Sequence, residues 1–97
     1  MDKFLYYNNL FSLYQKLLTP KERMIFSLYY EENLSMGEIA DIKGISRSAV
    51  GKTIKIVATK LDNYEDILGI YKQREEIIKI KDSTKDDNTR VLLEKLL

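Results

Sequence analysis

Apolar residues recur at helical spacing along most of the chain, and the alternating pattern of a strand is missing. A helix is predicted over residues 2–17, because one stripe at 100° per residue holds Phe4, Tyr7, Leu10, Phe11, Tyr14 and Leu17 and continues to Leu18. Later stripes occupy residues 64–81 and 89–97. With one proline and four glycines among 97 residues, the pattern predicts an all-α fold. We expect a compact bundle of five or six helices in one domain, residues 1–97, with a C-terminal helical extension.

Two capping boxes predict where the inner helices begin. Thr19 and Glu22 flank Pro20, which suits a first helical position, and Ser35 is followed three residues later by Glu38. The first of these helices should run to about Tyr30. Its inward residues should be Met24, Ile25, Leu28 and Tyr29. The second should run from about Ser35 to Ile42 and bury Ile39 and Ala40.

The C-terminal third is harder to divide. Asp62-Asn63 marks either a break or only a bend between helices, and Gly69 weakens the predicted helix 64–81 by about 1 kcal/mol relative to alanine. Residues 82–88 are polar and predict a loop. The apolar residues of the final segment are Val91, Leu92, Leu93, Leu96 and Leu97. They either cap the core or pair with a second subunit.

The segment from Ser35 to Val50 predicts a helix-turn-helix within a core of residues 19–61. Ala40 allows a close helix crossing, Gly44 supplies a left-handed turn, and Ile45 fills the corner. Val50 and Ile54 then anchor the second helix, about residues 47–61, on the first. The alternative is an ordinary helical hairpin.

The second helix of this motif should present a basic side. Residues 46–60 hold four basic and no acidic residues, although the whole chain has a net charge of only +1. The candidate nucleic-acid-binding residues are Arg47, Ser48, Lys52, Lys55 and Thr59. Lysine and arginine contact phosphates or guanine edges when a helix enters a major groove. The alternative is a solvated surface, which Ile56 on the same arc and Gly51 within the helix favour.

The composition excludes several classes of chemistry. Cysteine and histidine are absent, which rules out disulfides, zinc sites built from thiolates or imidazoles, and nucleophiles paired with histidine. We find no catalytic constellation of the remaining residues, and we expect no enzyme activity, cofactor, metal or small-molecule substrate. The start of the chain is too polar for a signal peptide or a membrane span, so we expect a cytoplasmic protein without membrane insertion.

Three segments together carry a family resemblance. Residues 18–23, 29–40 and 44–50 resemble region 4 of bacterial sigma factors, and the later Tyr64–Tyr71 segment makes the chain similar to the YlxM family of small bacterial proteins. The resemblance implies a non-enzymatic helix-turn-helix regulator linked to the signal recognition particle pathway. It also implies Arg47, Ser48, Lys52 and Lys55 as reading positions. Members of that family often have an aromatic residue at the position of Gly51 and an acidic one at that of Lys52.

Three hypotheses follow. The first is a regulator, expected to be a homodimer, that binds duplex DNA or the RNA of the signal recognition particle through Arg47, Lys52 and Lys55. The second is a protein-interaction module whose partner is a GTPase of that particle or a polymerase subunit, with the helix-turn-helix as a scaffold. The third, a sigma-like activator, is disfavoured because nothing resembles the sigma domain that opens promoters.

Overall fold

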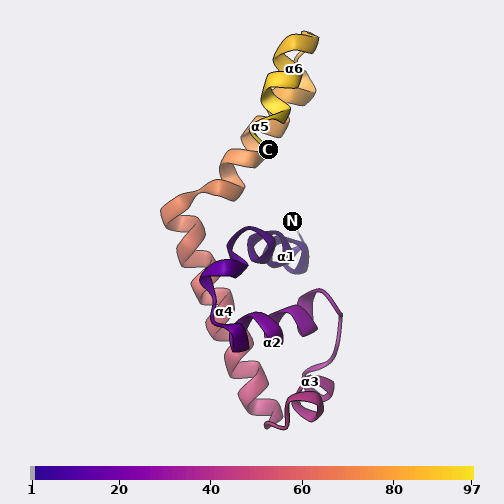
Figure 1. Ribbon diagram of the computed structural model, residues 1–97, viewed down its shortest axis with the longest axis vertical. Helices are drawn as coiled ribbons and strands as arrows, with labels where there is room; N and C mark the ends of the chain where they lie inside the picture. The colour runs from indigo at the N-terminus through magenta and orange to yellow at the C-terminus, as the bar shows by residue number, and fades with distance from the viewer. Residues whose placement is uncertain (1) are drawn as a thin grey trace.

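Six α-helices and one 3-10 turn make up residues 2–97, which are the residues that this computed structural model describes (Figure 1). They are α1 (Lys3–Tyr14), η1 (Gln15–Leu17), α2 (Pro20–Tyr30), α3 (Met36–Lys43), α4 (Arg47–Leu68), α5 (Ile70–Ser83) and α6 (Asp87–Glu94). No strand occurs within residues 2–97. The prediction of an all-α fold is therefore confirmed.

Side-chain caps fix the starts of the inner helices. Thr19 and Glu22 form a capping box at α2 with Pro20 in the first turn, and Ser35 and Glu38 form another at α3. Each box satisfies backbone N–H groups that a helix start leaves without partners. Both predicted caps are confirmed.

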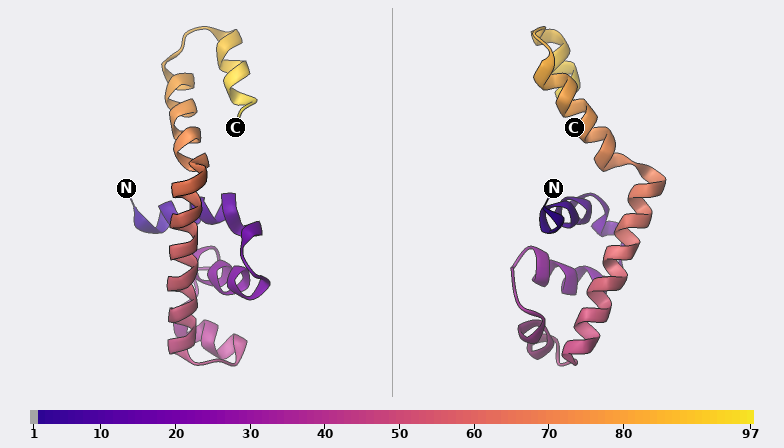
Figure 2. Two further views of the ribbon diagram at one scale, coloured as in Figure 1. Left: turned by 90° about the vertical axis from the view of Figure 1, so that its left-hand side faces the viewer. Right: turned by 180° about the vertical axis from the view of Figure 1, so that it is seen from behind.

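The core lies where α1, α2 and α3 pack along one side of α4 (Figure 2). Its buried residues are Leu10, Phe11, Tyr14, Leu18, Ile25, Phe26, Ile39, Ala40, Val50, Ile54, Val57 and Leu61. The prediction for Met24 is wrong, since its side chain is 50% exposed. Ile25 and Phe26 define the buried side of α2, and at 100° per residue position 24 lies on the other side.

The boundary between α4 and α5 differs from the prediction. α4 continues without a break through Asp62 and Asn63 and ends at Gly69, whose φ is 62°. That left-handed conformation is the one glycine adopts at low cost, so Gly69 ends a helix instead of weakening the inside of one. The change of direction also interrupts the predicted stripe over 64–81, and Ile67 within that range is 80% exposed.

Helices α5 and α6 form a hairpin that projects from the core, and we call residues 70–97 the arm (Figure 2). Asp86 caps α6 by accepting the N–H of Asn88, so α6 begins earlier and the loop is shorter than predicted. The arm lengthens the molecule to 54 × 24 × 22 Å, with a radius of gyration of 16.7 Å. A compact chain of this length has about 12–13 Å.

No helix within residues 2–97 combines the length and apolarity that a membrane crossing requires. In the same range, no three acidic side chains come together as a metal-binding group.

Candidate nucleic-acid interface

The turn between α3 and α4 brings the two helices into contact within a few residues. Gly44 ends α3 with φ 66°, and the N–H of Ile45 donates to the carbonyl of Ala40 over 3.1 Å. Ala40 is buried, and the half-buried Ile45 packs against the core. Ser46 then begins α4 by accepting the N–H of Ala49. These contacts make α3 and α4 a helix-turn-helix.

Burial of one side of α4 determines which side faces solvent. Val50, Ile54, Val57 and Leu61 lie on the same face at helical spacing, and none is more than 7% exposed. The opposite side of the helix therefore cannot rotate inward without emptying the core.

All five predicted binding residues are exposed on α4. They are Arg47, Ser48, Lys52, Lys55 and Thr59. Helical spacing places Ser48, Lys52, Lys55 and Thr59 on one arc, with Arg47 in the first turn. The Thr59 hydroxyl donates to the carbonyl of Lys55 over 3.1 Å, so its oxygen is left as an acceptor. We call Arg47, Lys52 and Lys55 the basic face.

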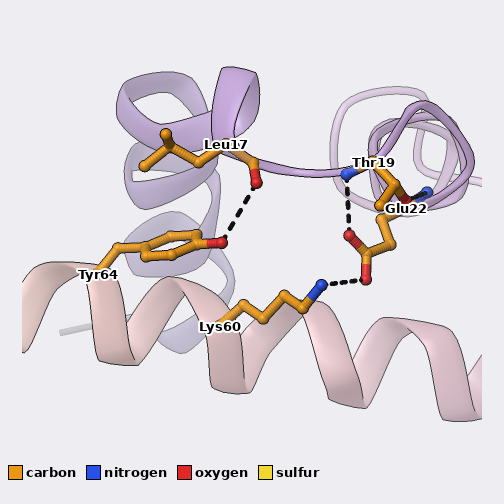
Figure 3. A network of polar contacts seen from close by, with 5 residues as sticks. All are labelled: Leu17, Thr19, Glu22, Lys60 and Tyr64. Carbon is orange, nitrogen blue, oxygen red and sulfur yellow. Dashed lines mark hydrogen bonds and ion pairs between the residues drawn. The ribbon is translucent and has the colours of Figure 1, made fainter.

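The fourth basic residue of this segment has a different role. Lys60 Nζ lies 2.7 Å from Glu22 Oε2, and the same carboxylate accepts the backbone N–H of Thr19 (Figure 3). The hydrogen bond from the Lys60 ammonium contributes most to holding the pKa of Glu22 below its usual value. Beside it, the Tyr64 hydroxyl donates to the carbonyl of Leu17. Lys60 thus joins α4 to the start of α2, a role that the sequence analysis missed.

A hollow of about 330 Å³ borders the basic face on the side of α1. It is lined by Lys3, Tyr7, Tyr30, Met36, Gly51, Ile54, Lys55, Ala58, Thr59 and Asp62. The Tyr7 hydroxyl donates to Asp62 Oδ2 over 2.9 Å, and burial together with this bond raises the pKa of Tyr7 to about 12. The hollow adds Lys3 to the cations near α4. Periodicity alone could not reveal this, because Lys3 lies on a different helix.

An apolar residue interrupts the basic side. Ile56 is 43% exposed, and it lies with Lys52, Lys55, Thr59 and Lys60 around a second shallow hollow of about 330 Å³. The side of α4 that faces solvent therefore offers lysine ammonium groups together with one aliphatic contact.

Comparisons with known proteins agree with this arrangement. A family model described as "Putative helix-turn-helix protein, YlxM / p13 like" matches residues 1–96. A UPF0122 protein of Oceanobacillus iheyensis is 40% identical over 85 residues, which cover 88% of this chain and 81% of that protein. One from Exiguobacterium sibiricum is 45% identical over 76 residues, 78% of this chain and 72% of its own. Another from Bacillus pumilus is 39% identical over 97 residues, 92% of this chain and 88% of its own.

Proposed function

This chain belongs to the YlxM/p13-like family of helix-turn-helix proteins, and from that premise we propose that it is a non-catalytic regulator that binds nucleic acid through the basic face of α4. We further propose that it acts in the cytoplasm as a homodimer. The resemblance to the YlxM family extends the proposal to the signal recognition particle pathway, which makes that particle's RNA a natural probe beside duplex DNA.

The exposure of the basic face is the observation that supports the proposal best. Arg47, Lys52 and Lys55 extend into solvent from a helix whose opposite side is fully committed to the core. Among the described residues no ion pair occupies them, whereas Lys60 of the same segment is paired with Glu22. Cations held at helical spacing and left without carboxylate partners suit contacts with successive phosphates.

The direct test is binding of the purified protein to labelled random duplex DNA and to signal recognition particle RNA by fluorescence anisotropy. We expect affinity for at least one of them to fall by orders of magnitude between low and moderate salt, because phosphate contacts release counterions. The triple substitution Arg47→Ala, Lys52→Ala and Lys55→Ala should abolish that binding while the helical content stays unchanged.

A matched control removes the same charge elsewhere. Lys16, Lys79 and Lys85 are exposed and lie outside α4, so alanine at these three positions should retain most of the binding. Equal losses of affinity in the two triple variants would show that binding depends on overall charge and not on the basic face, and would contradict the proposed site. Absence of binding to either probe at low salt would reject the proposal.

The exposed Ile56 favours a second candidate function, a protein-interaction surface with a GTPase of the particle or a polymerase subunit as partner. An exposed aliphatic side chain suits a partner that contributes an apolar contact. Such a complex would be weakened by Ile56→Ala and would depend only weakly on salt. Nucleic-acid binding through phosphates would show the reverse pattern.

A further inference from the structure

The arm contains no buried residue in either of its helices. α6 packs against α5, and both helices leave large apolar side chains in solvent. Those of the arm that are exposed are Ile78, Ile80, Val91, Leu92, Leu96 and Leu97. Helices of this length gain most of their stability from packing an apolar face, and α6 is only eight residues long. Ile70 and Tyr71 at the start of the arm pack against the core. The rest of the arm lacks the burial that helices of its size need.

The most exposed of these side chains share one side of the hairpin. Each helix turns by 100° per residue, and α5 and α6 run antiparallel (Figure 2). This places Ile80, Leu92 and Leu96 together, on the side away from the Lys81–Glu94 ion pair. The three are 53%, 61% and 65% exposed. We call them the arm face. Val91 lies on the opposite side of α6.

We infer that the arm face of one molecule pairs with the arm face of a second copy, so that two hairpins form a four-helix bundle. The pairing is isologous, since the same surface is used on both copies. This pairing rests on the proposed function only for its purpose, which is to hold two helix-turn-helix units in one dimer.

The charge of the arm supports a second copy as the occupant. Residues 70–97 carry seven basic and six acidic residues, so two arms approach with little net repulsion. A strongly charged partner, such as nucleic acid, would find no complementary field there.

The available area supports the same occupant. Burying the exposed parts of Ile80, Leu92 and Leu96 on both arms, together with the polar atoms that flank them, would remove on the order of 1,000 Å² from water, which reaches the lower range of specific interfaces. Mutual burial would also supply the packing that α6 lacks in the single molecule.

Sedimentation equilibrium of the full chain without nucleic acid tests the inference. We expect a mass of twice 11.4 kDa at micromolar concentration. Ile80→Glu with Leu96→Glu should weaken the association at least about tenfold, because it places carboxylates in an apolar contact. Val91→Glu is the matched control, with the same chemistry on the other side of α6, and it should leave the mass unchanged.

Cross-linking provides a readout that does not depend on a destabilising charge. The chain has no cysteine, so Leu92→Cys and Val91→Cys each introduce a single thiol. Under mild oxidation Leu92→Cys should form a covalent dimer, and Val91→Cys should stay mostly monomeric.

A monomeric wild-type mass would overturn the inference, as would equal cross-linking of the two cysteine variants or a dimer that Val91→Glu disrupts as strongly as the double change. None of these results involves nucleic acid. Failure of the pairing and failure of the binding function are therefore separate outcomes.

Discussion

The Tyr14 hydroxyl donates to Glu65 Oε1 over 2.6 Å and accepts the backbone N–H of Ile70 over 3.2 Å. The same glutamate accepts the N–H groups of Tyr71 and Lys72. Its carboxylate thus caps α5 from the end of α4, where negative charge is favoured at a helix start. Two side chains from α1 and α4 fix the direction in which the arm leaves the core.

Removing the Tyr14 hydroxyl should destabilise the protein. Tyr14→Phe keeps the buried ring but loses two hydrogen bonds, one of them to a carboxylate, and should lower the free energy of unfolding by about 1–3 kcal/mol. Urea denaturation followed by circular dichroism measures the change. Tyr29→Phe is the control, because Tyr29 makes ring contacts and no hydroxyl bond within the described residues. A smaller loss for Tyr14→Phe than for the control would contradict this role.

Stability should fall at alkaline pH in part through Tyr7. Burial and the bond to Asp62 raise the pKa of Tyr7 from 10.0 to about 12, so the folded state holds this proton more tightly than the unfolded chain does. The resulting stabilisation is complete below pH 10 and is lost as pH rises toward 12. Unfolding measured across this range should show a shallower fall for Tyr7→Phe. Parallel curves for the two proteins would refute the assignment.

Two glycines should respond in opposite directions to alanine. Gly51 lies inside α4, and an added Cβ would meet Met36 Sδ at 3.5 Å, an ordinary contact, so Gly51→Ala should stabilise by about 0.5–1 kcal/mol. At Gly69 the positive φ makes alanine unfavourable, and Gly69→Ala should cost about 1–2 kcal/mol. Thermal unfolding of both variants tests the pair. A neutral Gly69→Ala would contradict this prediction, because it would mean that the boundary between α4 and α5 does not need a left-handed residue.

Neighbouring lysines on α4 should differ in their contribution to binding. Lys55→Ala should reduce the slope of log binding constant against log salt concentration by about one, the contribution of one phosphate contact. Lys60→Ala should leave that slope unchanged, because Glu22 already holds its ammonium group. It should instead reduce stability only slightly, as expected for a partly exposed ion pair. Anisotropy over a salt series measures the slopes, and equal slopes for the two variants would contradict the division.

Most of the fold could be predicted because local rules and packing agree in the first two thirds of the chain. The caps at Thr19, Ser35 and Ser46 follow from side chains within three residues. The inward residues of α4 follow from one period. Gly69 could not be placed in the same way, since a glycine in an apolar stripe either weakens a helix or ends it. The contacts that decide come from Tyr14 and Glu65, 51 residues apart in sequence.

The candidate site shows the same limit. Exposure of Arg47, Lys52 and Lys55 follows from the buried stripe on the same helix, and the sequence could predict it. The pairing of Lys60 with Glu22 spans 38 residues and depends on how α2 crosses α4. The charge count over residues 46–60 therefore included a cation that serves the fold. Such a distinction requires the tertiary arrangement.

The uninterrupted α4 also connects the helix-turn-helix to the arm. Its 22 residues span about 33 Å, with the helix-turn-helix at one end and Gly69 at the other. Because α4 is one continuous helix, the arm and the helix-turn-helix keep a fixed orientation about its axis. One residue inserted just before Gly69 would rotate the arm by about 100° about the axis of α4 while the core kept its place. The number of residues in α4 therefore sets the direction in which the arm points relative to the basic face.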